Sequence, residues 1–282
     1  MIIQRVKSFA EYLEHKKGME CEYKRRWELE LKNQPEDKKP FLLDGISYPA
    51  GEKVKFKSDF KYSNGNQVNW REQLVCPVTG LNNRLRAAVH LADSELGLIP
   101  GESIYLTEQT TPLFRFFQKR HPKIVDSEYL ESKVSQGSID KSGIRNEDLT
   151  RLSFEDKSFD IVLSFECLEH VPNFDKAMKE MARVLKPGGK MMWSVPFRSD
   201  RETNLNRAEL KPDGTIVHHE PPEYHGDPLN PEGCLCFTHF GWQMLDQVKN
   251  AGFQTVYAVF YWSDIFCYFG RGVIFVAIKS RL

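Results

Sequence analysis

The chain has 282 residues, which is enough for one large domain or for a domain with an appendage. Lysine plus arginine and aspartate plus glutamate both number 39, so no net field directs the protein toward nucleic acid or an anionic membrane. No apolar run is long enough to span a bilayer, and we expect no signal peptide. The six cysteines form no paired C-x-x-C motif, so a reducing cytoplasm is the expected location.

The N-terminal part is expected to be an appendage over residues 1–85, followed by a main domain over residues 86–282. Residues 9–31 are charged and helix-prone, which predicts an exposed helix. Residues 41–70 contain short alternating runs bounded by turn signals, which predicts a small β-rich segment.

The next segment predicts strands over 103–108, 123–129 and 144–147, with a helix over 113–119 between the first two. Each strand ends at or just before an acid: Glu108, Glu128 and Asp148. Glu128 follows Glu108 by 20 residues (128 − 108), the separation at which dinucleotide-binding folds place a carboxylate on the ribose hydroxyls. These acids are the main internal indication of a nucleoside cofactor.

Residues 152–197 predict a strand, a helix and a second strand. The strands are the apolar runs 159–165 and 191–195, and Asn173 is the expected N-cap of a helix over 174–185. Met178, Met181, Ala182 and Leu185 fall on one face of that helix. Such a unit is a right-handed βαβ crossover of a parallel sheet.

The same residues spell S-F-x-x-x-S-F-D-x-V-x-S-x-x-x-L-E-H-V-P and then A-x-x-E-x-x-R-V-L-K-P-G-G. This motif resembles the class I S-adenosylmethionine-dependent methyltransferases, in their small-molecule, type 11-like branch. The resemblance implies an α/β fold with a Rossmann-like, seven-stranded, mostly parallel sheet covered by helices on both faces. It also implies S-adenosylmethionine as the cofactor.

The resemblance assigns roles residue by residue. Glu108 would face the methionine end of the cofactor, Glu128 the ribose and Asp148 the adenine amine. The remaining expected cofactor contacts are Thr110, Tyr129, Leu149, Ser164 and Phe165. One departure from the family is that the first turn reads Glu108-Gln-Thr-Thr-Pro, without the usual glycines that let the backbone approach the ligand.

Residues 198–236 form a long polar insertion, which the family places over the methyl-donor site as a substrate loop. A hairpin is predicted over 207–218. His225 is the first candidate for a general base, and Glu223 and Tyr224 beside it are the other candidate catalytic residues of the loop. His170 is the second candidate base. A structural role remains open for either histidine. The last two strands, 253–262 and 273–279, are expected to be antiparallel.

A metal site is a second possibility that we leave open, although the favoured interpretation contains no metal. Glu166, Glu169 and His170 spell E-x-x-E-H. Together with a downstream histidine, this resembles the metal site of small-RNA-end 2′-O-methyltransferases and of some quinone-ring O-methyltransferases. The downstream candidates are His218, His219, His225 and His239.

The sequence therefore predicts an S-adenosylmethionine-dependent methyltransferase with a small-molecule substrate. The expected acceptor atom is an oxygen, with nitrogen as the alternative, on a polar molecule such as a saccharide. A methyltransferase-like protein that binds a partner without turnover is the first alternative, because the glycine turn is missing. A nicotinamide-dependent oxidoreductase is disfavoured by the absence of G-x-G-x-x-G. The oligomeric state stays open.

Overall fold

The computed structural model describes residues 1–63, 65 and 67–281, and the chain divides into two compact units. The first unit comprises Met1–Leu98 and Ala258–Ile274, and the second comprises Ile99–Tyr257 and Phe275–Leu282. The first unit thus combines the N-terminal residues with a segment from near the C-terminus, and the expected division at residue 85 stays a prediction. None of the helices described is both long and apolar enough to cross a membrane.

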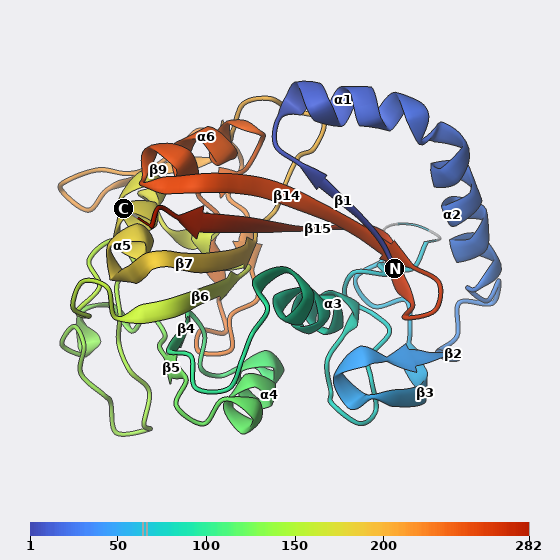
Figure 1. Ribbon diagram of the computed structural model, residues 1–282, viewed down its shortest axis with the longest axis horizontal. Coiled ribbons are helices and arrows are strands. Elements are labelled where there is room, and N and C mark those ends of the chain that lie inside the picture. The colour runs from blue at the N-terminus through green and yellow to red at the C-terminus, as the bar shows by residue number, and fades with distance from the viewer. Residues whose placement is uncertain (64, 66, 282) are drawn as a thin grey trace. The chain divides into compact units, whose positions relative to one another are not determined.

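The second unit is built on parallel strands. They are β4 (Ile104–Leu106), β5 (Val125–Asp126), β6 (Phe159–Phe165) and β7 (Leu185–Ser194). β4 pairs with both β5 and β6, and β6 pairs with β7, all in parallel (Figure 1). β7 pairs antiparallel with Phe275–Ile278 of β15 (Tyr268–Lys279). Six of the seven residues of β6 are buried, as expected for a strand covered on both faces.

Three helices accompany these strands: α4 (Pro112–Arg120), α5 (Phe174–Val184) and α6 (Gln243–Asn250). From the central pair β4 and β6, the connection through α4 leads outward to β5 and that through α5 leads outward to β7. Because βαβ crossovers are right-handed, two crossovers that leave in opposite directions place their helices on opposite faces of the sheet. The point of reversal lies between β4 and β6, where ligands of open α/β sheets bind.

Helix α5 confirms the local prediction. The Asn173 side chain accepts a hydrogen bond from Lys176 N at 3.0 Å, which caps the first turn. Met178, Met181 and Ala182 are buried on the inner face. The helix ends at Val184, one residue early, because Leu185 has an extended backbone and begins β7.

The complete sheet has seven strands in the order β1-β14-β15-β7-β6-β4-β5, and this mixed α/β fold confirms the predicted class. The membership differs from expectation at one strand. Residues 144–147 form no strand, and only the parallel bridge between Glu128 and Asn146 stands in that place. The Asn146 side chain instead forms hydrogen bonds with the backbone of Leu130, Glu131 and Val134. These side-chain hydrogen bonds stand in place of the backbone hydrogen bonds of a strand pair. The seventh strand is β1 (Ile2–Val6).

The insertion after β7 consists of short antiparallel pairs. β9 pairs with β10, and this pair confirms the predicted hairpin. β11 pairs with β12, and β8 pairs with β13. These strands are β8 (Leu205–Asn206), β9 (Ala208–Leu210), β10 (Ile216–His218), β11 (Tyr224–His225), β12 (Cys234–Leu235) and β13 (Thr238–His239).

The first unit has its own apolar cluster, which includes Phe56, Trp70, Leu74, Trp262 and Phe269. Its helices are α1 (Phe9–Gly18), α2 (Glu20–Lys32) and α3 (Asn83–Leu91). Its strands are β1, the hairpin β2 (Phe41–Ser47) and β3 (Glu52–Ser58), and parts of β14 (Phe253–Ser263) and β15. β1 pairs antiparallel with β14, from Ile2 opposite Trp262 to Val6 opposite Ala258. This pairing explains why a segment from near the C-terminus belongs to the first unit.

Candidate functional site

The turn after β4 is held by a carboxylate. Glu128 Oε1 accepts hydrogen bonds from Gln109 N at 2.7 Å, from Thr110 N at 2.9 Å and from Thr110 Oγ1 at 2.9 Å. Two backbone N–H groups that a glycine-rich turn would offer to a ligand are therefore directed at Glu128. Thr111 caps α4 by accepting from Phe114 N.

The predicted adenine end gathers beside Glu128. Residue 129 is a tyrosine whose side chain is 64% exposed. Partial burial and the charges of Asp148 and Glu131 raise the pKa of Tyr129. Asp148 Oδ1 accepts from the backbone N and the hydroxyl of Thr150, both at 2.8 Å, while Leu149 is buried. The parallel bridge between Glu128 and Asn146 brings the segments that carry Tyr129 and Asp148 side by side.

Ser164 and Phe165 lie at the carboxyl end of β6 and are buried. Thr107 Oγ1 donates to Ser164 Oγ at 2.9 Å, which ties β6 to the end of β4 at the switch point. Cys167 follows β6 and lies between Phe165 and Glu169 in the chain. Its thiol has a pKa raised by burial, and Glu169, Glu128 and Glu108 add repulsion to the thiolate. The end of β6, which leads to Cys167 and Glu169, therefore lies beside the end of β4, which leads to the turn held by Glu128.

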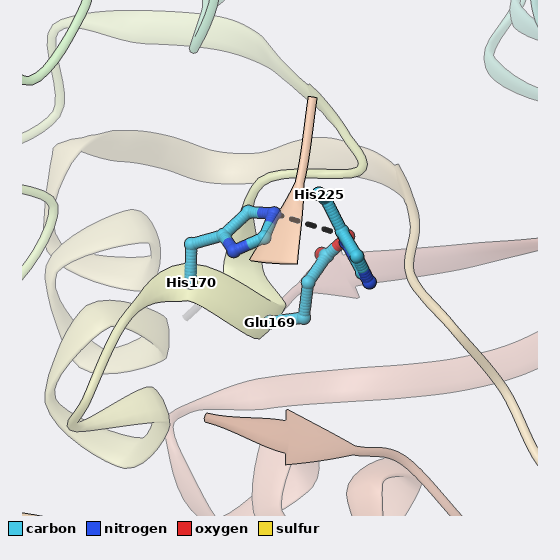
Figure 2. A group of neighbouring side chains, drawn as sticks. All are labelled: Glu169, His170 and His225. Carbon is cyan, nitrogen blue, oxygen red and sulfur yellow. Dashed lines mark ion pairs between the residues drawn. The ribbon is translucent and has the colours of Figure 1, made fainter. Parts of the chain in front are cut away.

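A second cluster, which we call the Glu169 cluster, consists of Glu169, His170 and His225 (Figure 2). Glu169 and His170 come from the short helix η4 (Leu168–His170) after β6, and His225 comes from β11 in the insertion. Glu169 Oε1 lies 3.7 Å from His170 Nε2 and 3.6 Å from His225 Nδ1. Figure 2 shows the His170 ring pointing toward the Glu169 carboxylate, with the His225 ring beside it.

Backbone hydrogen bonds from the end of the insertion hold these distant segments together. Phe237 N donates to the Glu169 carbonyl and Cys236 N donates to the Glu223 carbonyl, each at 2.8 Å. His170 Nδ1 donates to the Leu235 carbonyl at 2.8 Å. Residues 235–237 thus connect η4 to the strand that carries His225.

Glu223 positions the His225 ring. Its Oε1 accepts from His225 Nε2 and from His239 Nε2, each at 3.0 Å, and its Oε2 pairs with Arg207 Nη2 at 3.2 Å. Tyr224 lies between Glu223 and His225 in the chain but is 58% exposed. Of the candidate catalytic residues, the structure therefore brings Glu223, His225 and His170 together, while Tyr224 faces solvent.

Burial and neighbouring side chains shift the pKa values of Glu169 and His225. Burial raises the pKa of Glu169, whose side chain has no exposed surface. The neighbouring Cys236, Glu169 and Glu223 side chains raise the pKa of His225 to about 11.

Sequence reasoning located the cluster but not its full membership. Glu166 accepts a hydrogen bond from Ser194 Oγ at 2.6 Å and is not a member of the converging group. His218 and His219 are exposed on the hairpin. Arg207 and Cys236 carried no signal in the sequence, because only the folded insertion brings them beside Glu223 and His225.

Comparison with known proteins shows that part of the chain is similar to methyltransferases. The model of the family described as “Methyltransferase domain” matches residues 118–193. The chain is 42% identical over 89 residues to sterol 4-C-methyltransferase strm-1 of Caenorhabditis elegans, covering 32% of this chain and 25% of that protein. It is 33% identical over 89 residues to norajmaline N-methyltransferase of Rauvolfia serpentina, covering 29% and 30%. Both matches span less than a third of the curated relative.

A solved structure is similar over more of the chain. It is 1,6-didemethyltoxoflavin-N1-methyltransferase of Burkholderia thailandensis with bound 1,6-didemethyltoxoflavin and S-adenosylhomocysteine. The TM-score is 0.43 at 13% identity, over 70% of this chain and 78% of that one.

Residues 118–193 match the methyltransferase domain model, and this match confirms the predicted resemblance to the class I S-adenosylmethionine-dependent methyltransferases. The same matches support S-adenosylmethionine as the cofactor.

The residues of the site fit the nucleoside half of this cofactor. Glu128 uses Oε1 for the turn, so Oε2 is left to accept from a vicinal diol. The Tyr129 ring is largely exposed, and the hydrogen bonds to Thr150 use only Oδ1 of Asp148. For the methionine half of the cofactor, this turn offers fewer backbone donors than a glycine-rich turn would. The N–H groups of Gln109 and Thr110 already donate to Glu128.

Proposed function

We propose that the protein transfers a methyl group from S-adenosylmethionine to an oxygen of a small polar molecule. The observation that carries this proposal is the meeting of two groups at the carboxyl ends of β4 and β6. One is the acidic edge with Glu128 and Asp148, which the turn after β4 contacts, and the other is the Glu169 cluster after β6, which includes a residue of the insertion. A nucleoside site next to a proton-handling group is the arrangement that alkylation of a hydroxyl requires.

The proposed cofactor contacts follow the sequence assignment. Glu128 Oε2 accepts from the ribose hydroxyls, Asp148 accepts from the adenine amine, and Tyr129 and Leu149 border the ring. Ser164 and Phe165 form the floor between β4 and β6, which agrees with their burial. Glu108 and the Thr110 hydroxyl remain the contacts proposed for the methionine end.

The cofactor supplies an electrophilic methyl group on a sulfonium. The protein's part is to align the acceptor oxygen with that methyl and to take its proton. Alignment contributes about 7 kcal/mol or more in well-oriented systems, and a general base about 10²–10⁴-fold in rate. His170 and His225 are the proposed proton acceptors. His225 would accept the proton from its neutral form, in which its raised pKa makes it the stronger base, and Glu223 acts through His225 as a positioning residue. The exposed Tyr224 hydroxyl is free to contact the acceptor.

The polar character of the insertion supports a polar acceptor. Residues 218–227 include three histidines, two glutamates (one of them Glu223) and one aspartate, and no valine, leucine or isoleucine. Such groups hydrogen-bond hydroxyl-rich ligands, so we propose a saccharide as the acceptor class, with an amine nitrogen as the alternative acceptor.

Two measurements test the proposal. Calorimetry with S-adenosylhomocysteine should give a dissociation constant in the micromolar range, and an excess of a nicotinamide dinucleotide should not displace it. An assay that detects S-adenosylhomocysteine release should then give turnover with a member of a panel of saccharides, polyols and amines. Turnover only with the amines would overturn the choice of oxygen.

A second candidate function is binding of a partner without methyl transfer. The observation in its favour is that Glu128 already accepts hydrogen bonds from the N–H groups of Gln109 and Thr110. Fewer backbone donors are then available to the methionine end of the cofactor. The same calorimetric titration separates the two candidates. No detectable heat with S-adenosylhomocysteine would favour the binding protein and contradict the enzyme.

A further inference from the structure

The Glu169 cluster has the geometry of a three-ligand metal site. One ligand atom from each of Glu169, His170 and His225 lies within 4.8 Å of the other two. The two shortest separations, from Glu169 Oε1 to His170 Nε2 and His225 Nδ1, are 3.7 and 3.6 Å. Bonds of about 2.1 Å arranged tetrahedrally separate neighbouring ligand atoms by about 3.4 Å. Small side-chain movements would therefore close these atoms on one ion.

Glu169 is an acceptor that lacks donors. Its side chain has no exposed surface, and among the described residues neither carboxylate oxygen has a hydrogen-bond partner. The distances to the two histidines are longer than a hydrogen bond. Buried charges in proteins are normally paired and hydrogen-bonded or coordinate a metal. A cation between the three side chains would satisfy this carboxylate.

Hydrogen bonds orient both imidazoles for coordination. A carbonyl oxygen can only accept, so the contact from His170 Nδ1 to Leu235 O puts the proton on Nδ1 and leaves Nε2 toward Glu169. By the same reasoning His225 Nε2 donates to Glu223 Oε1, so Nδ1 is the nitrogen near Glu169. A carbonyl or carboxylate behind each ring is the usual outer partner of a metal-ligating histidine.

A neighbouring group, Glu223 with Cys236 and His239, also has converging atoms but fits a cation less well. Glu223 Oε1 already accepts from both His225 and His239, and Arg207 lies on Oε2. A metal ion there would displace donors and face a guanidinium. Glu223 is therefore the outer partner of the first group rather than a ligand of a second site.

We propose that Glu169, His170 and His225 bind one divalent first-row transition-metal ion. Two imidazoles and one carboxylate suit ions such as Mn²⁺, Fe²⁺, Co²⁺ and Zn²⁺ better than Mg²⁺ or Ca²⁺, which prefer oxygen ligands. Three protein ligands leave coordination positions open. An acceptor hydroxyl bound at an open position would ionise more readily. This last role rests on the proposed methyl transfer, in which the ion would then activate the hydroxyl in place of the two histidines, whereas metal binding itself does not.

The test uses the full chain, freed of metal with a chelator and dialysed. Titration with Zn²⁺ should show one high-affinity equivalent by calorimetry, and Co²⁺ should give visible d–d absorption. Glu169→Gln and His225→Gln should each weaken Zn²⁺ binding at least 100-fold, and Glu223→Gln, which alters only the outer partner, by about 10- to 100-fold. His219→Gln is the matched control, because His219 lies in the same insertion outside the cluster, and it should bind like the unmodified chain.

Circular dichroism of each variant checks folding, so that a loss of metal binding is not confused with unfolding. Zn²⁺ binding by His225→Gln equal to that of the unmodified chain would overturn the proposal, as would the absence of Zn²⁺ and Co²⁺ binding in the unmodified chain. Calorimetry with S-adenosylhomocysteine on the metal-free chain is a separate readout. Failure of metal binding with nucleoside binding intact would refute the metal site and leave the proposed methyltransferase standing.

Discussion

Glu128 offers the sharpest test of the cofactor site. In Glu128→Gln the amide oxygen can still accept the three hydrogen bonds from Gln109 and Thr110. The amide nitrogen, a donor, then replaces the carboxylate oxygen proposed to accept from the ribose. Loss of one hydrogen bond to a charged group costs about 1.5–3 kcal/mol, which corresponds to about 10- to 150-fold in the dissociation constant. The loop itself should lose only about 1 kcal/mol, because its bonds become neutral rather than absent.

The assay is calorimetry with S-adenosylhomocysteine, alongside denaturant unfolding to measure the loss of stability. Glu131→Gln is a suitable control, because Glu131 is a nearby exposed acid whose carboxylate pairs with Lys133. It changes the net charge equally and should leave the affinity unaltered. If Glu128→Gln bound within twofold of the unmodified chain, Glu128 would hold the turn and nothing more, and its assignment to the ribose would be refuted.

Three further predictions concern the same unit. Asp148→Ala should weaken S-adenosylhomocysteine binding at least tenfold by calorimetry, and unaltered affinity would remove Asp148 from the adenine site. Burial, reinforced by the Glu128 charge, raises the pKa of Asp126 from 3.8 to about 6. The folded chain therefore holds this proton more tightly than the unfolded chain, and the free energy of unfolding falls as pH rises from about 4 to about 6. Asp126→Asn should lessen that fall in urea unfolding at pH 4 and pH 7, and identical pH dependence would contradict the reasoning. Met178→Ala, which empties a fully buried position on α5, should lower the free energy of unfolding by about 2–5 kcal/mol in the same assay, and a loss below about 1 kcal/mol would contradict tight packing there.

Local patterns were sufficient wherever a segment's structure depends on its own residues. The apolar run 159–165 became β6, and the face of Met178, Met181 and Ala182 became the inner side of α5. Asn173 caps that helix as its position before Phe174 predicts. These features follow from periodicity and capping, which are set by residues within a few positions of one another.

Long-range contacts decided what the pattern left open. Residues 144–147 have a strand-like composition, but Asn146 uses its side chain on nearby backbone groups, and the expected strand is reduced to a single bridge. The N-terminal residues 2–6 instead add a strand by pairing with β14. When two strands that pair lie far apart in the chain, the periodicity of each segment does not reveal its partner. The resemblance therefore predicted a seven-stranded sheet, but the sequence did not predict which segments would form the seven strands.

The candidate site divides in the same way. The sequence by itself determined the methyltransferase motif, the acids at the strand ends and the candidate histidines, because each lies within or beside one local element. Only the tertiary structure decided that His225, rather than His218 or His219, reaches Glu169, and that Glu166 stays outside the converging group. The physical reason is that a site is defined by distances of a few ångströms between segments. Here the backbone bonds of residues 235–237 fix those distances across a loop whose path the sequence does not specify.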